Sequence, residues 1–297
     1  MRLGEILRRK QVLLFDGAMG TQLAARGLEQ SGIQNLMNPD AVQSIHEDYI
    51  RAGAQVLITN TLTMNRLLLD AYGRGDDIYT INRRGVELAR AAAGSRPVLG
   101  DMSSTGRLLE PYGDAKEIDL INCFCEQANI LAQSGVDGFI IETMIDLREA
   151  VCALRACRQT TSLPIFVTLS FSTMKDGGRT AMGNRAEECA ATLSREKSDA
   201  IGVNCGNLDP FEVAEVIARF RQNTDLPIIA QPNAGKPKME NGTAVFDLSP
   251  PEFARGLMEC VRSGARFVGG CCGTSPAHVS EAAKLLGAEF AKDSSNL

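Results

Sequence analysis

The sequence predicts a single (β/α)8 (TIM) barrel domain that spans residues 1–297. Eight short apolar runs are each followed by a stretch with helical patterning, as a barrel of alternating strands and helices requires. The length of 297 residues suits one such barrel. The main alternative, a doubly wound open sheet, is disfavoured because no G-x-G-x-x-G fingerprint follows the first apolar run.

The predicted strands are short, and most of them lead directly into a polar or glycine-containing tip. In chain order they are Val12–Phe15, Val56–Ile58, Pro97–Gly100, Phe139–Ile141, Ile165–Leu169, the run from Ala200 that leads into Cys205, Ile228–Ala230, and the run from Arg266 that ends in Cys271-Cys272.

Proline and short polar residues mark the starts of several predicted helices. Asn38-Pro39-Asp40 begins a helix that runs to about Ala52, and Asp209-Pro210 and Ser249-Pro250 open two later ones. Helical patterning also covers the segment from Leu62 to about Ala93, the segment after the loop Met102–Asp114 to about Ser134, and the segments from about Asp146 to Thr160, from about Arg185 to Arg195, and from Pro276 onwards. Only the tail, Lys292–Leu297, is predicted to fray.

Composition excludes several classes of protein. The hydrophobic content of 44% and the charged content of 23% are typical of a soluble globular protein, and no apolar run is long enough to cross a membrane. Nine cysteines without an export signal predict a reducing, cytoplasmic location. A net charge of −5 without a basic run argues against a nucleic-acid partner. With only His46 and His278, both on helices and predicted to pack or face solvent, an H-x-H metallohydrolase is also excluded.

Three cysteines stand apart from the other six. Cys205 follows the sixth strand, and Cys271 and Cys272 lie between glycines at the tip of the eighth. Because the ends of barrel strands meet at one mouth, these thiols are predicted to converge as a three-sulfur zinc site with one open position, the form of a catalytic site. The other six fall on helical patterns and are expected to be inert core residues, namely Cys123, Cys125, Cys152, Cys157, Cys189 and Cys260.

Acidic side chains are expected at the same mouth. Asp16 and Glu142 follow buried strands, where an unpaired carboxylate is costly, so an ammonium group is a suitable partner. Asp101 also follows a strand, but capping a helix or satisfying a loop is an equally good interpretation of that residue.

Six stretches together resemble the zinc-dependent homocysteine S-methyltransferase family, and within it the homocysteine-binding module of cobalamin-dependent methionine synthases. The likeness covers about residues 5 to 287. The stretches are Phe15-Asp16-Gly17-Ala18-Met19-Gly20-Thr21, Thr59-Asn60-Thr61, Glu142-Thr143-Met144, Val203-Asn204-Cys205, Gln231-Pro232-Asn233-Ala234-Gly235 and Gly269-Gly270-Cys271-Cys272-Gly273-Thr274.

The resemblance implies an enzyme that methylates the homocysteine thiolate to give methionine. It implies that Cys205, Cys271 and Cys272 hold Zn²⁺ with the substrate sulfur as fourth ligand. Asp16 and Glu142 would then hold the ammonium group, and backbone around Gly17 and Ala18 would receive the carboxylate. From the matched stretches, Thr61, Asn204 and Asn233 are predicted to complete the substrate site.

The methyl donor stays open at the level of sequence. The favoured donor is a methylcorrinoid (methylcobalamin). No D-x-H-x-x-G corrinoid-binding signature is present, so this donor is expected to be carried by a separate protein. S-methylmethionine, a betaine or a different thiol acceptor are the alternatives, although 5% aromatic content without Trp supports an aromatic cage for a quaternary ammonium poorly. A non-catalytic zinc- or thiol-binding barrel and a barrel lyase or hydrolase with inert cysteines are the remaining interpretations.

Overall fold

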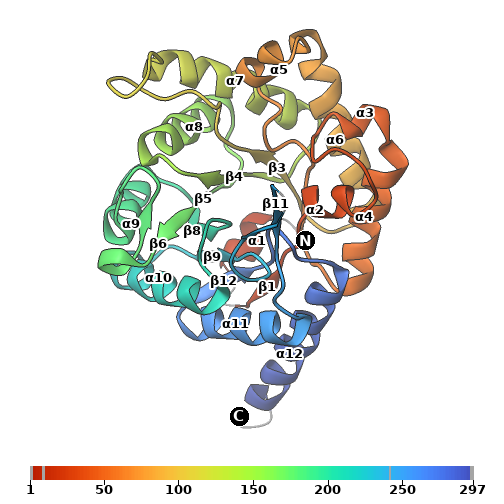
Figure 1. Cartoon of the computed structure of the whole chain (residues 1–297), viewed down its shortest axis with the longest axis vertical. Coiled ribbons are helices and arrows are strands. Elements are labelled where there is room, and N and C mark those ends of the chain that lie inside the picture. Colours follow the sequence, from red (N-terminus) through yellow and green to blue (C-terminus); the bar gives the residue numbers. More distant parts are fainter. Residues whose placement is uncertain (1–2, 9–10, 241, 295–297) are drawn as a thin grey trace.

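The computed structural model describes residues 3–8, 11–240 and 242–294. Within them, eight parallel strands form one sheet in the order β1-β12-β9-β8-β5-β4-β3-β2, and a parallel bridge between Phe15 and Val56 joins its two edges (Figure 1). The predicted (β/α)8 barrel is therefore confirmed. The strands are β1 (Leu13–Leu14), β2 (Leu57–Ile58), β3 (Val98–Met102), β4 (Gly138–Met144), β5 (Ile165–Leu169), β8 (Ala200–Asn204), β9 (Ile228–Gln231) and β12 (Ala265–Val268).

A helix follows every barrel strand and packs on the outside of the sheet (Figure 1). The capping signals act as predicted at α10, where the Asp209 side chain accepts hydrogen bonds from the Phe211 and Glu212 N–H groups and Pro210 occupies the first turn. These outer helices are α4 (Pro39–Ala52), α6 (Ile78–Ala93), α7 (Glu117–Gln133), α8 (Leu147–Thr160), α9 (Ala186–Arg195), α10 (Pro210–Asn223), α11 (Pro250–Arg262) and α12 (Pro276–Ser294).

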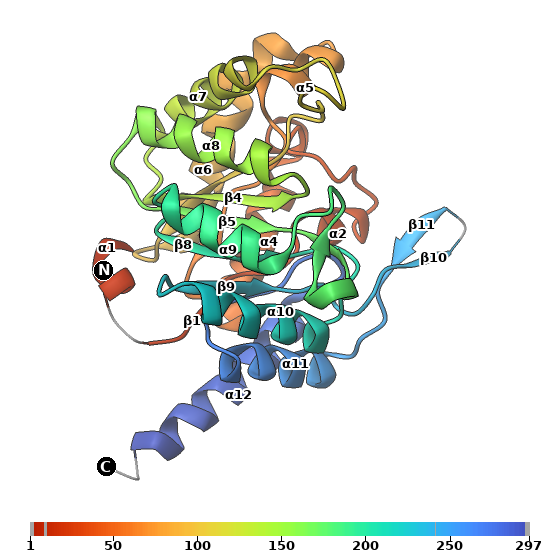
Figure 2. The ribbon, with the colours of Figure 1, turned by 90° about the vertical axis from the view of Figure 1, so that its left-hand side faces the viewer.

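Smaller elements decorate the two ends of the barrel. Helix α1 (Leu3–Arg8) lies at the end opposite to the hairpin of β10 (Lys238–Glu240) and β11 (Thr243–Val245), which projects from the other end (Figure 2). The remaining short elements are α2 (Gly20–Ala24), α3 (Gln34–Met37), α5 (Arg66–Ala71), the 3-10 turns η1 (Gly75–Asp77) and η2 (Lys175–Gly177), and the hairpin strands β6 (Phe171–Thr173) and β7 (Arg179–Thr180).

Every second side chain of a barrel strand points inward, and these side chains fill the barrel interior. The rings of Phe15, Phe166 and Phe267 stack on one another there, with centroids 5.2 to 6.3 Å apart. Because alternate residues of a strand point to the same side, the residues two positions further along form the next layer toward the mouth. The apolar rings thus fill the barrel interior, and a ligand site has to lie between them and the mouth at the C-terminal ends of the strands.

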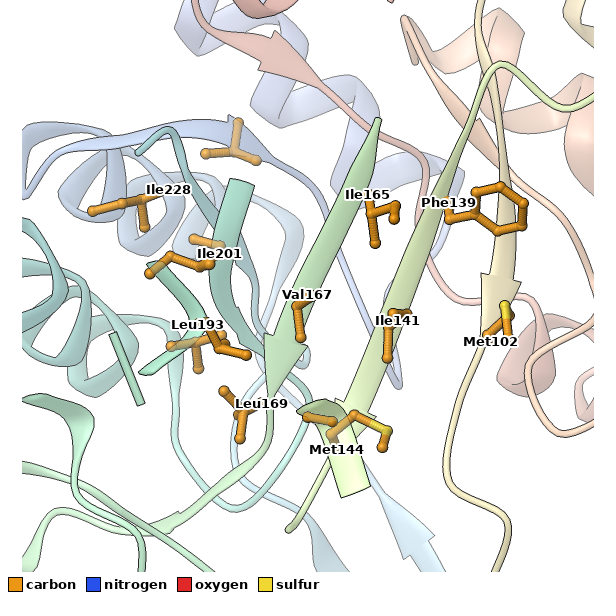
Figure 3. Packing of buried hydrophobic residues seen from close by; sticks show 14 of the residues in the cluster. Met102, Phe139, Ile141, Met144, Ile165, Val167, Leu169, Leu193, Ile201 and Ile228 are labelled. Carbon is orange, nitrogen blue, oxygen red and sulfur yellow. The ribbon is translucent and has the colours of Figure 1, made fainter. Parts of the chain in front are cut away.

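The outward faces of the strands pack against the helices. Ile141, Val167 and Leu169 are among the buried side chains of this second, larger cluster (Figure 3). The six cysteines predicted to be inert all lie on outer helices, as expected. No helix in the described part of the chain combines the length and apolar character that a membrane span needs.

Several element ends differ from the prediction, and those of β3, β4 and β12 affect where site residues lie. Strands β3 and β4 continue past their apolar runs, so Asp101 and Glu142 lie within strands, because the ladder between the two strands continues to the Met102–Ile141 pair. Strand β12 instead stops at Val268, so Cys271 lies in the following loop. In the predicted frayed tail, α12 continues to Ser294, and residues 295–297 lie outside the described residues.

Helix α4 carries a buried histidine that predicts how stability depends on pH. His46 is fully buried, and neither ring nitrogen has a hydrogen-bond partner among the described residues. Burial lowers its pKa to about 4, whereas an unfolded histidine has a pKa near about 6.5. The unfolded state therefore binds a proton at His46 more tightly than the folded state does. Burial of the neutral imidazole leaves stability undiminished above about pH 6.5, and the free energy of unfolding falls as the pH drops towards 4.

Replacing His46 with methionine should remove this pH dependence. The wild-type free energy of unfolding should fall by up to about 3 kcal/mol more than that of the variant between pH 6.5 and 4. Denaturant unfolding of both proteins across this range measures the difference, and carboxylates that titrate in both proteins cancel from it. Parallel curves would show that the buried imidazole is not responsible.

Candidate active site

A pocket of about 200 Å³ lies at the C-terminal ends of the barrel strands. All three predicted zinc ligands and all three predicted acids line it, together with Gly17 and Ala18 of the loop after β1. These lining residues are Asp16, Gly17, Ala18, Asp101, Glu142, Cys205, Cys271 and Cys272. The fold therefore brings residues of β3 and β4, and of the segments that follow β1, β8 and β12, into one cavity.

The three thiols converge at one side of this pocket. Cys205 follows β8 and the other two cysteines follow β12, and the intervening strand β9 pairs with both. The Sγ atoms of Cys205 and Cys272 are 3.8 Å apart, and all three sulfurs lie within 4.8 Å of one another. Two thiolates at about 2.3 Å from a tetrahedral zinc lie about 3.8 Å from each other, so this arrangement fits a zinc ion bound by three sulfurs.

The backbone at Cys205 has an unusual conformation that presents its side chain. Its φ of 54° is in the left-handed region, which costs a non-glycine residue of order 1–3 kcal/mol. Gly206 follows with φ 79°, and a Cβ there would lie 2.3 Å from the Phe171 carbonyl oxygen. The strand therefore turns sharply after Asn204, and the turn places the thiol over the pocket.

Hydrogen bonds among the three thiols shift their pKa values in opposite directions. Hydrogen bonds from the Cys271 and Cys272 thiols lower the pKa of Cys205 well below its ordinary value, and a contact from Asn233 adds to this. The same hydrogen bonds to Cys205 raise the pKa of Cys271, and that of Cys272 to about 12. These hydrogen bonds favour a negative charge on Cys205 over the other two cysteines, and a cation at their centre would favour deprotonation of all three thiols.

All three acids line the pocket, and Asp101 and Glu142 lie two positions beyond Leu99 and Ile140 of the apolar barrel interior. Burial raises the pKa of all three carboxyl groups, and that of Glu142 reaches about 8 with a further contribution from Cys205. Asp16 Oδ2 accepts a hydrogen bond of 2.9 Å from the Ile58 N–H, whereas Asp101 Oδ1 and Glu142 Oε2 have no partner among the described residues. The pocket is therefore prepared for a positively charged group.

The loop after β1 is tied to the loop that carries Cys271. The Ala18 N–H donates to Thr274 Oγ1 at 3.0 Å, and that hydroxyl donates to the Cys271 carbonyl at 2.7 Å. The Tyr49 hydroxyl donates to the Ala18 carbonyl at 2.7 Å. A Cβ on Gly17 would lie 2.7 Å from Thr274 Oγ1, so only glycine fits. The Ala18 amide predicted to receive a carboxylate is thus already bonded to Thr274.

Three further residues were predicted to bind the substrate, namely Thr61, Asn204 and Asn233. All three are buried, and none is among the described residues that line the pocket. The Thr61 hydroxyl donates to the Asp101 carbonyl at 2.8 Å, and the Asn233 amide donates to the Gly206 carbonyl at 2.8 Å. Both residues support pocket-lining segments, and their substrate contacts stay predictions.

Asn204 links three strand tips through its side-chain amide. Its Oδ1 accepts from the Thr143 N–H and the Thr168 hydroxyl, both at 2.7 Å, and its Nδ2 donates to Thr143 Oγ1 at 2.7 Å. Nδ2 also approaches Cys271 Sγ at 3.8 Å. The side chain thus connects β4, β5 and β8 next to the thiols, and its direct substrate contact stays a prediction.

Four residues near the thiols and the Ala18 loop were not predicted from the sequence as individual site residues, namely Tyr49, Thr143, Thr168 and Gln231. Tyr49 is fully buried on α4 and has the pattern of an ordinary core aromatic. Thr143 and Gln231 belonged to matched stretches, but nothing local distinguished them from their neighbours. For Gln231, the period-two position after the buried Ile229 was a usable signal of an inward-facing side chain.

Comparison with known proteins connects this geometry to a family. Residues 13–286 match the family model of homocysteine S-methyltransferase. The chain is 32% identical to methionine synthase of Mycobacterium tuberculosis and 31% identical to that of Mycobacterium leprae, with 93% of the chain covered in each case. The chain spans about a quarter of the length of these relatives (25% and 24%).

Among solved structures, the metallated form of the homocysteine methyltransferase MmuM from Escherichia coli superposes with a TM-score of 0.80. The two are 23% identical, and the match covers 95% of this chain and 99% of MmuM, which shows a common fold. The family model and the methionine synthase relatives agree with the site that the barrel assembles. The chain therefore belongs to the homocysteine S-methyltransferase family.

Proposed function

We propose that the chain transfers a methyl group to the thiolate of homocysteine and so produces methionine. The observation that carries this proposal is the combination, in one pocket, of three converging thiols with buried carboxylates that lack a cationic partner. The thiols suit zinc and a sulfur substrate, and the carboxylates suit the ammonium group of an amino acid.

Each group has a defined task in this reaction. Cys205, Cys271 and Cys272 would hold Zn²⁺, which supplies the positive charge that keeps a substrate thiol ionised at neutral pH. The acids orient the substrate through its ammonium group, so that the sulfur is held beside the cysteines. The substrate thiolate then attacks the donor's methyl carbon: an S–CH3 bond forms, the donor–CH3 bond breaks, and its electron pair stays with the donor.

The donor that we propose is a methylcorrinoid carried by a separate protein. A pocket of about 200 Å³ holds a small amino acid but not a corrin macrocycle, so a corrinoid has to meet the substrate from outside the mouth. Large hydrophobic side chains that are exposed in the described residues support a protein carrier. All of them lie between a barrel strand and the first turn of its helix, at the mouth end: Met37, Tyr72, Tyr79, Leu108, Tyr112, Ile118, Ile145, Phe211 and Met239.

A donor screen tests the proposed function. Zinc-loaded protein and homocysteine are incubated separately with methylcobalamin, S-methylmethionine and betaine, and methionine is quantified. We expect methionine with methylcobalamin at high concentration. A high concentration is needed because free methylcobalamin is a poorer donor than the same group on its carrier protein. Preferential methionine formation from either small donor would overturn the donor assignment. Binding of zinc and homocysteine without methionine from any donor would favour a non-catalytic barrel.

A further inference from the structure

The side-chain amide of Asn204 is fully engaged in hydrogen bonds at the strand tips beside the thiols. Asn204 is completely buried at the end of β8. Its Oδ1 accepts from the Thr143 N–H and the Thr168 hydroxyl, and its Nδ2 donates to Thr143 Oγ1 and approaches Cys271 Sγ at 3.8 Å. An asparagine amide accepts two hydrogen bonds and donates two, so a substrate group could bind it only by displacing one of these partners.

The partners of this amide fix its orientation. The Thr143 backbone N–H can only donate, so the Asn204 atom that lies 2.7 Å from it has to be the oxygen. The nitrogen is thereby placed beside Thr143 Oγ1 and the Cys271 sulfur. The group that Asn204 presents to Cys271 is therefore an N–H donor, which suits a thiolate.

Strained backbone lies on both sides of the amide. Thr143 has a φ of 59° and Cys205 a φ of 54°, and each costs of order 1–3 kcal/mol in this left-handed region, which a β-branched residue rarely adopts. The register between β4 and β5 shifts between Ile141 and Met144, so Thr143 lies in an irregular part of the ladder. The two hydrogen bonds between Asn204 and Thr143 hold this conformation. Strain at two neighbouring strand tips indicates a functional constraint, and the thiols lie next to both tips.

An N–H donor beside a thiolate ligand changes the properties of a metal site. Three thiolates around Zn²⁺ leave an excess of negative charge, and a substrate thiolate adds to it. A hydrogen bond takes up part of the charge on a sulfur and holds that sulfur in one orientation. The Cys205 sulfur accepts such a bond from the Asn233 side chain, and Asn204 offers one to Cys271.

We propose that Asn204 is a positioning residue of the metal site, which donates an N–H···S hydrogen bond to Cys271 and locks the strained tips of β4 and β8. This role differs from the substrate contact that the sequence predicts for Asn204. The inference rests on the proposed function only in requiring a metal ion at the three thiols.

Metal binding by wild type and Asn204→Leu tests this role, because leucine has a similar shape but no polar side-chain atom. The variant should bind zinc about tenfold or more weakly in competition with a chelator. In Co²⁺-substituted protein, its sulfur-to-metal charge-transfer band should move to longer wavelength, because a sulfur without a hydrogen bond gives up an electron more easily. Unchanged zinc affinity together with an unchanged band would overturn the proposal.

Two control variants separate the bond to sulfur from general structural damage. Asn82→Leu removes another fully buried amide, which donates to two backbone carbonyl groups from α6. Thr168→Val removes one hydrogen bond to Asn204 Oδ1 but leaves Nδ2 beside Cys271. Both controls should be less stable than wild type and should keep its zinc affinity and charge-transfer band. A band shift in Thr168→Val as large as that in Asn204→Leu would contradict a specific role of the N–H···S bond.

A measurement on the wild type decides the matter if Asn204→Leu does not fold. In ¹⁵N-labelled protein loaded with ¹¹³Cd²⁺, the Asn204 Nδ2 proton, identified by its contacts with Thr143, should show scalar coupling to the metal through the Cys271 sulfur. Metal binding without this coupling would overturn the proposal and leave the proposed function intact. If the wild type bound neither Zn²⁺ nor Cd²⁺, the proposed function itself would fail, and the role of Asn204 with it.

Discussion

Replacing Cys271 with alanine is expected to remove the zinc and to reduce methyl transfer to homocysteine by at least about a thousandfold. The three sulfurs lie within 4.8 Å of one another, so each of them can contribute one ligand to the same ion. A site with two remaining thiolates binds zinc more weakly, and without the metal a free thiol near pH 7 is only about a few per cent ionised. Loss of several kcal/mol of charge stabilisation corresponds to this reduction in rate.

Metal analysis and methionine formation measure both effects in the same preparation. Cys125→Ala is the matched control, because Cys125 is a half-buried cysteine on α7, away from the pocket. It should keep about one zinc per chain and full activity. The barrel has its own core, so the Cys271 variant should remain folded. Equal zinc content in the Cys271 variant and the wild type would contradict the assignment of this ligand.

Proton release gives an independent readout of the same site. Homocysteine that binds as a thiolate below its free pKa should release close to one proton per molecule near pH 7. Calorimetry in buffers with different ionisation enthalpies measures this number. The wild type with zinc should show the release, and the Cys271 variant should show none.

Replacing Glu142 with glutamine is expected to weaken homocysteine binding by about 2–5 kcal/mol while zinc remains bound. The Glu142 carboxyl group is buried in the wall of the pocket, and its Oε2 has no partner among the described residues. A bound ammonium group would lose a charge-assisted partner in a site from which water is largely excluded. The substitution retains the size of the side chain, so changes in packing are small.

Calorimetric titration with homocysteine measures this loss, and zinc analysis checks the metal. Asp16→Asn should act in the same direction with a smaller effect, because Asp16 Oδ2 is already engaged by the Ile58 N–H. Unchanged homocysteine affinity in both variants would show that the carboxylates serve another purpose. A parallel loss of zinc would assign the effect to the metal site instead.

The fold class and the candidate zinc ligands could be predicted from the sequence because both depend on local signals. Eight apolar runs followed by helical patterns specify alternating strands and helices whatever their final packing. Adjacent cysteines between glycines cannot both face one apolar layer, so Cys271 and Cys272 were identifiable as a site without knowledge of their partners. The predicted ends of β3 and β4 were too early, because the apolar runs end before Asp101 and Glu142 whereas the strands continue through these residues.

Tertiary structure alone decided which residues share the pocket and which support it. The Phe15–Val56 bridge closes the barrel, and pairing of β9 with both β8 and β12 brings Cys205 to residues 66 and 67 positions away. Tyr49 and Thr274 act through hydrogen bonds to Ala18 across long stretches of chain. No local pattern contains such pairs, because a hydrogen bond between distant segments depends on where the whole barrel places both partners.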